Sequence, residues 1–157
     1  MEEKNRVIIP QEEEIIRIHD YLADAHKTPA GVLTSPGYVP SFCENYLSEE
    51  GITPVIAFIL SRLTKGHYFQ DGNKRTAYFT GKYTALRNGF DFNGSSPEDT
   101  VNEMIQLSTL DDESSRKYAQ ELVERDLIKL DYKLDNLSQF ERLVLKNIAV
   151  STRLSAN

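Results

Sequence analysis

The chain has 157 residues, of which 39% are hydrophobic, and this is enough for one domain with a buried core. Its net charge of −6 and pI of about 5.1 argue against a nucleic-acid partner bound through a general basic surface. Cys43 is the single cysteine, which excludes an internal disulfide and suits a cytoplasmic protein. We expect no membrane partner, since no apolar run reaches membrane-spanning length and no signal-peptide pattern opens the chain.

The first part of the chain predicts a helix, a loop and a short second helix. Apolar side chains recur at helical spacing over residues 11–25, namely Ile15, Ile18 and Leu22, after three glutamates that suit a first helical turn. Residues 28–40 hold three prolines and two glycines, which predicts a loop. Residues 41–47 predict a short helix, in which we expect Cys43 to be a buried packing residue rather than a nucleophile.

Two further predicted helices flank a polar connector. Residues 53–65 indicate a buried helix, because their apolar side chains cover more than one face and Thr53-Pro54 is a start signal. Residues 75–88 indicate a second helix, which Asn88-Gly89 would end. The connector therefore leads into a helix N-terminus, where unpaired N–H groups and the helix dipole attract anions, above all phosphate.

The side chains of the connector suit a bound phosphate. Gly72 permits a tight turn and the close approach of an oxygen-rich ligand, and Asn73 offers amide hydrogen bonds. Lys74 and Arg75 supply positive charge. Asp71 would repel a phosphate unless a divalent cation such as Mg²⁺ lay between them.

The two remaining candidates are His67 and Phe69. An imidazole titrates near neutral pH, so His67 could accept a proton from a hydroxyl that attacks the phosphate. We expect Phe69 to be a core residue that pins the loop. Each residue alone has an ordinary explanation, since a histidine after a helix usually caps or packs and the Asp-Gly-Asn and Lys-Arg pairs are common in turns and on solvated helix starts. Their ordered combination favours a binding site.

The run from His67 to Ala77 resembles the signature of the Fic/Doc family, and more closely its Doc (death on curing) branch. Fic members typically show His-Pro-Phe-x-Asp/Glu-Gly-Asn-Gly-Arg with a second arginine three residues later, and Doc members show His-x-Phe-x-Asp-x-Asn-Lys-Arg-Thr. This chain has Lys74 in place of the second Fic glycine and Tyr78 in place of the second Fic arginine. It keeps Gly72, as in Fic, where Doc often has alanine.

The resemblance implies an all-α, mainly helical Fic/Doc fold over residues 1–126, with a short β-hairpin flap or strand. It also implies transfer of part of a nucleotide triphosphate, ATP with Mg²⁺, onto a protein hydroxyl. His67 would be the general base, Asp71 would hold Mg²⁺, and Phe69 would anchor the motif in the core. The residues that bind the nucleotide phosphates would be Gly72, Asn73, Lys74 and Arg75.

Lys74 bears on which group is transferred. In Fic enzymes two glycines leave an open anion hole for the outer phosphates, so the α-phosphate faces the nucleophile and AMP is transferred. A lysine at the second position should fill part of that hole, and the Doc branch, which carries this lysine, transfers the γ-phosphate. Because the phosphate that the fixed cations hold in line is the one that reacts, we favour phosphate transfer over AMP transfer.

Other classes of function fit the same residues. The motif could belong to a catalytically silent nucleotide- or phosphopeptide-binding module, or its histidine and carboxylate could hydrolyse a phosphate or remove a modification. The resemblance to Doc implies a toxin of a toxin–antitoxin system, with a target protein such as a translation factor and an antitoxin or inhibitor as partner. The oligomeric state is left open.

Two segments before the motif also resemble Doc proteins. The pair Ile18-His19 resembles the Ile-His of their first helix, and we interpret His19 as structural. The run 31–33 (Gly-Val-Leu) resembles their Gly-Leu-Leu segment. In the wider family a flap near the active site pairs with an extended stretch of the target. The loop 28–40 is either this flap or a connector whose apolar residues tuck into the core.

The chain after the motif predicts a turn over residues 89–94 and then two helices. Ser96-Pro97 starts the first helix, with serine as the cap and proline at its first position, and the second spans residues 112–124. Residues 127–157 are expected to form a C-terminal extension packed on the same domain. Within it, residues 127–134 alternate as a strand does, and helical spacing returns from Ser138 through Phe140, Leu143, Leu145 and Ile148.

Overall fold

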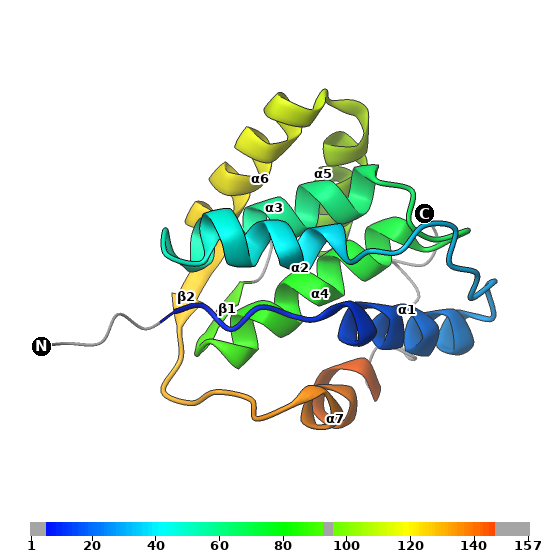
Figure 1. The fold of residues 1–157 in the computed structure, drawn as a ribbon, viewed down its shortest axis with the longest axis horizontal. Coiled ribbons are helices and arrows are strands. Elements are labelled where there is room, and N and C mark those ends of the chain that lie inside the picture. The colour runs from blue at the N-terminus through cyan, green and yellow to red at the C-terminus, as the bar shows by residue number, and fades with distance from the viewer. Residues whose placement is uncertain (1–5, 93–95, 147–157) are drawn as a thin grey trace, which may run out of the picture.

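The computed structural model describes residues 6–92 and 96–146 and shows the mainly helical fold that the sequence predicts (Figure 1). In chain order its elements are α1 (Glu12–His26), α2 (Tyr38–Phe42), a π-helical turn η1 (Cys43–Leu47), α3 (Ile52–Lys65), α4 (Asn73–Arg87), β1 (Phe90–Phe92), α5 (Pro97–Thr109), α6 (Asp112–Asp126), β2 (Leu127–Lys129), α7 (Leu137–Phe140) and a second π-helical turn η2 (Glu141–Leu145). Within the described ranges, no helix is both long and apolar enough to cross a membrane.

Helix α3 is the centre of the fold. It packs against α4 on one side and against α5 and α6 on the other, while α1 packs on α4 (Figure 1). The predicted burial of α3 on more than one face is confirmed by its fully covered side chains, which include Val55, Ile56, Ile59 and Leu63. Because α3 leads directly into the motif and α4 leads out of it, this packing fixes both ends of the connector.

The signals at the helix ends explain where several elements begin. The Ser96 hydroxyl accepts a hydrogen bond from the Asp99 N–H at 3.1 Å, so the predicted cap of α5 is confirmed. Cys43 is buried, as predicted, and burial raises the pKa of its thiol to about 12. A thiol with so high a pKa is protonated at neutral pH, which agrees with its interpretation as a packing residue.

The segment after α4 differs from the prediction. Residues 90–92 form strand β1 and not part of a turn, and β1 pairs antiparallel with β2, with Phe90 opposite Lys129 and Phe92 opposite Leu127. The local turn signals hid this strand, because its pairing partner lies 37 residues further along the chain. The strand predicted over 127–134 is confirmed for Leu127–Lys129 alone. Beyond it the chain is irregular, with Tyr132 exposed and Leu134 buried.

The C-terminal part packs on α1 and α4. Leu134, Leu137, Phe140 and Leu145 form one apolar cluster with residues of those helices, namely Ile18, Leu22, Phe79, Tyr83 and Leu86. Helix α7 begins at Leu137, and the side chain of Asn136 caps it by accepting a hydrogen bond from the Gln139 N–H at 2.9 Å. Leu143, which the spacing predicts to face inward, is 56% exposed, and Ile148 lies outside the described residues.

The substitution Phe140→Ala tests how much this apolar cluster contributes to the stability of the fold. Its ring is fully buried, with its centroid 5.1 Å from that of Tyr83. We expect Phe140→Ala to lower the free energy of unfolding by about 3–5 kcal/mol, because it removes buried apolar surface and leaves a cavity. Chemical denaturation measures the change. The matched control is Tyr132→Ala in the same extension, which is 54% exposed and should change stability by less than about 0.5 kcal/mol. Similar losses in both variants would contradict the packing role.

Candidate active site

A pocket of about 340 Å³ lies at the N-terminus of α4. It is lined by the end of α3, the connector, the first turn of α4 and one residue of α5: Thr64, Lys65, His67, Gln70, Asp71, Gly72, Asn73, Lys74, Arg75 and Ser108. Every residue predicted for the site is in this lining except Phe69, which is 1% exposed and belongs to the core. The structure thus brings the predicted residues to one place, and their individual roles stay predictions.

His67 occupies an unusual backbone conformation. Helix α3 ends at Lys65, and His67 follows with a φ of 50°, in the left-handed region that non-glycine residues seldom adopt. Gly66 precedes it because a Cβ there would lie 2.1 Å from the Tyr68 ring. The turn leaves the His67 side chain exposed at the pocket, so the simple packing explanation for this histidine does not hold.

Asn73 fastens the loop through its side-chain amide. Its Oδ1 accepts a hydrogen bond from the Phe69 N–H at 3.1 Å, and its Nδ2 donates to the Phe69 carbonyl at 2.9 Å. Both ends of the amide are therefore directed to the backbone of the buried residue. Contact between Asn73 and a phosphate would then go through its backbone N–H, which lies in the first turn of α4 and has no intrahelical partner.

His19 of α1 holds the same loop from the other side. Its Nε2–H donates to the Asp71 carbonyl oxygen at 2.6 Å, an assignment that follows because a carbonyl can only accept. Its ring stacks on Phe69 at a centroid distance of 3.9 Å and an angle of 7°, and the residue is 1% exposed. These contacts agree with the structural role interpreted for His19 from the sequence. They also show that His19 supports the motif loop.

Arg75 is a buried cation beside the pocket. It is 6% exposed, and its Nη2 donates to the Thr28 hydroxyl at 3.0 Å. Among the described residues no carboxylate lies within 4.0 Å of it, and its Nε has no hydrogen-bond acceptor. An unpaired buried charge is costly, so an anion in the pocket would be stabilised strongly. Burial and then the charge of Arg75 lower the pKa of His26 nearby, which favours its neutral form.

Gly72 allows this guanidinium to approach the backbone. It caps α4 with a φ of 77°, and a Cβ at this position would lie 2.9 Å from the Arg75 Nη2. The free N–H groups of the first turn of α4 and the Arg75 guanidinium therefore border the same pocket. Lys74, half-buried, adds a second cation to this lining.

Asp71 suits a magnesium ion that arrives with phosphate. Its side chain is exposed at the pocket, and its Oδ1 accepts a hydrogen bond from the Gly72 N–H at 2.7 Å, which leaves Oδ2 available. Mg²⁺ is commonly held by one or two carboxylates together with substrate phosphates and water. The part of the chain that the structure describes has no group of three His, Cys, Asp or Glu residues that could hold a metal ion by itself. Asp71 therefore fits the ion as a shared ligand.

The segment 31–34 runs beside the motif loop. Val32 and Phe69 form an antiparallel bridge, in which the Leu33 N–H donates to the Tyr68 carbonyl at 2.8 Å and the Gln70 N–H donates to the Gly31 carbonyl at 2.9 Å. Val32 and Leu33 are 42% and 65% exposed, so the connector alternative, with these side chains in the core, is wrong. The segment has the position expected of a flap, and pairing with a target stays a prediction.

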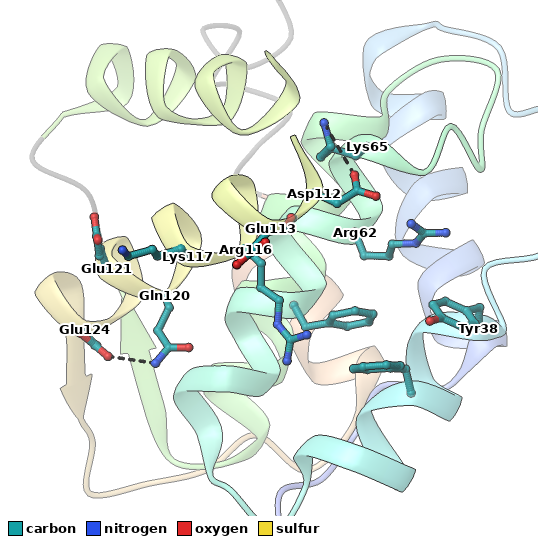
Figure 2. A pocket seen from close by; sticks show the side chains of 13 residues that line it. Tyr38, Arg62, Lys65, Asp112, Glu113, Arg116, Lys117, Gln120, Glu121 and Glu124 are labelled. Atoms are coloured by element: carbon teal, nitrogen blue, oxygen red, sulfur yellow. Dashed lines mark hydrogen bonds and ion pairs between the residues drawn. The ribbon is translucent and has the colours of Figure 1, made fainter. Parts of the chain in front are cut away.

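A second, larger groove adjoins the pocket, and Lys65 belongs to the lining of both (Figure 2). It lies between α2, α3 and α6 and was not predicted from the sequence. Its residues come from three separated stretches of the chain, around 38–42, 58–65 and 112–124, and no local motif marks them.

The hydrogen bond of His19 can be tested without removing its ring. In His19→Phe the aromatic contact with Phe69 is kept, but the Asp71 carbonyl loses its donor. We expect faster amide hydrogen exchange over residues 70–73 and a loss of about 1 kcal/mol in the free energy of unfolding. Exchange in α6 should be unchanged, and His19→Gln, which can still donate, should recover part of the protection. Identical exchange over 70–73 in wild type and His19→Phe would contradict the role of His19.

The comparisons with known proteins agree with this geometry. The model of the Fic/DOC family matches residues 9–85, a range that includes α1, the segment 31–34, α3 and the whole motif. No curated protein and no solved structure matches the chain. Residues 9–85 are thus similar to the Fic/DOC family, whose members are typically transferases that modify proteins and use nucleotide substrates such as ATP.

Proposed function

We propose that the chain is a Doc-like toxin that transfers the γ-phosphate of ATP, with Mg²⁺, to a hydroxyl of a target protein. The observation that carries this proposal is the pair of cations at the start of α4. Lys74 lines the pocket, and Arg75 is buried beside it with no carboxylate partner in the described part of the chain. Together with the N–H groups of the first turn, they make a site for several phosphate charges.

In this proposal some residues of the pocket bind the nucleotide and its metal ion, and His67 acts on the target hydroxyl. Arg75 and the start of α4 would hold the non-reacting phosphates, and Asp71 would hold Mg²⁺. When bound, the ion neutralises phosphate charge and aligns the reacting group. His67 would accept the proton of the target hydroxyl while its oxygen forms a bond to the γ-phosphorus. The bond from that phosphorus to the bridging oxygen breaks, and ADP leaves with the electron pair.

Lys74 favours phosphate transfer over AMP transfer. Where Fic enzymes have a second glycine and an open anion hole, this chain has a half-buried lysine in the pocket lining. The long cationic side chain reduces the room for outer phosphates and attracts the phosphate closest to it. AMP transfer is the second candidate, and Gly72 favours it, because the glycine leaves the Arg75 guanidinium close to the backbone, as a phosphate-cradling turn requires. The same His67, Asp71 and Arg75 would serve either product.

The toxin role and the antitoxin partner rest on the resemblance to Doc alone. A toxin that modifies a protein of its own cell would stop growth when expressed without its inhibitor, and co-expression of the inhibitor would restore growth. If the chain were a catalytically silent binding module, any growth arrest would not depend on its catalytic residues. The same catalytic variant can therefore be tested in the tube and in the cell.

His67→Asn tests the proposed base. Asparagine tolerates the left-handed backbone of this position better than alanine does, so the loop should keep its shape. We expect modification of target proteins to fall at least about 100-fold, while the affinity for Mg²⁺-ATP, measured by calorimetry, stays within about twofold. Wild type incubated with a cell lysate should transfer label to protein from γ-labelled ATP and not from α-labelled ATP, and its expression should arrest growth.

Each part of this test has a contrary outcome. Label that reaches protein from the α position alone would exclude phosphate transfer and favour AMP transfer. Equal labelling by His67→Asn would remove His67 from the mechanism. ATP binding with no labelling by wild type would leave the binding module as the better description.

Lys74→Gly tests what decides the product. Removing the lysine restores the second glycine of the Fic pattern and opens the space beside the first turn of α4, so we expect γ-phosphate transfer to fall and AMP transfer to rise. Lys74→Ala is the matched control for backbone flexibility, since it removes the same charge and side-chain length without the freedom that glycine adds and that costs a helix about 1 kcal/mol. Both are assayed with the two labelled nucleotides. An unchanged ratio of phosphate to AMP transfer in Lys74→Gly would show that Lys74 does not decide which group is transferred.

A further inference from the structure

The groove beside the active site has an aromatic floor (Figure 2). It measures about 720 Å³ and lies where α2, α3 and α6 meet. Phe42 and Phe58 stack with their ring centroids 4.4 Å apart, and the Tyr38 ring lies 5.8 Å from Phe42. Tyr38 is 52% exposed and Phe42 half-buried, so ring surface is open to solvent inside a hollow. Such surfaces are typical of sites that bind another molecule.

Two arginines lie over this floor. The Arg116 guanidinium carbon is 5.5 Å and 5.4 Å from the ring centroids of Phe42 and Phe58, and that of Arg62 is 5.2 Å from the ring of Tyr38. The Arg62 Nε also donates to the Tyr68 hydroxyl at 3.0 Å. These contacts orient both planar groups and leave most of their N–H donors free. In the described part of the chain neither arginine has a carboxylate within 4.0 Å.

In the described residues no acidic side chain of the groove lies within 4.0 Å of either arginine, although the hydrogen bond to Tyr68 and then the charge of Asp112 raise the pKa of Arg62. The acidic residues that line the groove belong to α6, namely Asp112, Glu113, Glu121 and Glu124. Asp112 lies 3.9 Å from the Lys65 ammonium, and Glu124 accepts a hydrogen bond from Gln120 at 3.2 Å. Figure 2 shows Glu121 and Glu124 at the end of the groove away from Arg62 and Tyr38. The aromatic floor therefore lies next to two guanidinium groups that have no close ion-pair partner within the described ranges.

The groove is joined to the active site. Lys65 lines both hollows, and the residue that holds Arg62 is Tyr68 of the motif loop. The carbonyl of Tyr68 also accepts hydrogen bonds from the N–H groups of Leu33 and Thr34, in the segment beside the motif. A protein whose hydroxyl reaches the active-site pocket would therefore meet this groove beside it, across Lys65.

We propose that the groove docks the target protein through a segment in which an apolar or aromatic side chain is next to a carboxylate. The apolar side chain would lie on the floor of Phe42 and Phe58, and the carboxylate would pair with Arg62 and Arg116. A guanidinium binds a carboxylate through two parallel hydrogen bonds, and arginine and aromatic residues often carry most of the energy of an interface. The inference rests on the proposed function, because it takes the modified protein as the occupant.

The test uses the full chain and a protein that it labels. Arg62→Gln and Arg116→Gln are combined, and the first protein labelled in the lysate experiment is purified as substrate. We expect its KM to rise about tenfold or more, with the affinity for Mg²⁺-ATP unchanged, because neither arginine lines the active-site pocket. Arg116→Gln alone leaves the hydrogen bond from Arg62 to Tyr68 of the motif loop in place, so it should raise KM with kcat unchanged. The control is Arg125→Gln, an exposed arginine that pairs with Glu103 at 2.9 Å, and its KM should equal that of wild type.

A second pair of variants keeps the test valid if the glutamine pair folds poorly. Arg62→Lys with Arg116→Lys keeps both charges and loses the planar fork, so its KM should lie between those of wild type and the glutamine pair. Replacing the docking carboxylate of the substrate with glutamine should raise KM for wild type and have little further effect in the glutamine pair, which shows that the groups interact.

The outcomes separate the two proposals. An unchanged KM in both double variants, with labelling by wild type intact, would overturn docking in the groove and leave the proposed function standing. A wild-type chain that labels no protein would remove both. Loss of ATP binding in the glutamine pair would assign the arginines to the nucleotide, and a dimer in wild type that the glutamine pair dissociates would assign the groove to a second copy. Either result would overturn the proposal.

Discussion

The hydrogen bond between His19 and the Asp71 carbonyl ties the motif loop to the rest of the fold. The loop connects two helices that run through the core, and by itself it has little regular backbone pairing. His19 holds one point of it, Asn73 bonds both backbone groups of Phe69, and Phe69 places its ring in the core. Because the three contacts share the same short stretch, weakening one would loosen the others. The side chains that face the pocket are therefore held in place by His19 and Phe69, which do not line it, and by Asn73, whose side-chain amide bonds to the Phe69 backbone.

This support allows an unfavourable arrangement of charge to persist. Arg75 is nearly fully buried beside the pocket, where its Nη2 donates to the Thr28 hydroxyl and its Nε has no acceptor in the described residues. Removing a guanidinium from water without a counter-ion lowers the stability of the protein, whereas a phosphate at the same place would recover that free energy. A site built in advance in this way needs little rearrangement when the ligand charge arrives, which is the property that favours catalysis.

Local signals in the sequence predict the parts of the fold that local interactions create. The start of α5 follows from Ser96 and Pro97, and burial of α3 follows from its own apolar residues. The candidate site could be predicted because His67, Asp71 and Arg75 are close in sequence, and contiguity alone brings them to one pocket. The same reasoning cannot find a contact between residues 52 positions apart, so the sequence predicts a structural role for His19 but not its partner, the Asp71 carbonyl.

The errors have a similar cause. Strand β1 is three residues long and exists through its pairing with β2, so its own sequence gives a turn as the better prediction. The alternation over residues 127–134 predicts a longer strand, but β1 offers three residues to pair with, and beyond them the chain follows the contacts of Leu134 with the second apolar cluster. The groove needs α2, α3 and α6 to meet, and its arginines look like ordinary surface charges until their aromatic neighbours are known.

The start of α4 is positively charged, whereas α1, α5 and α6 begin with acidic residues and the first turn of α3 is uncharged. Acidic residues at a helix start are stabilised by the positive end of the helix dipole. Helix α4 has no acidic residue in its first turn and carries Lys74 and Arg75 there instead. Two cations at the positive end of a dipole repel it and each other, and in a protein with a net charge of −6 there is no general excess of basic residues to explain them. An anion bound at this position is attracted both by the dipole and by the two cations, so it offsets their mutual repulsion and stabilises the start of α4.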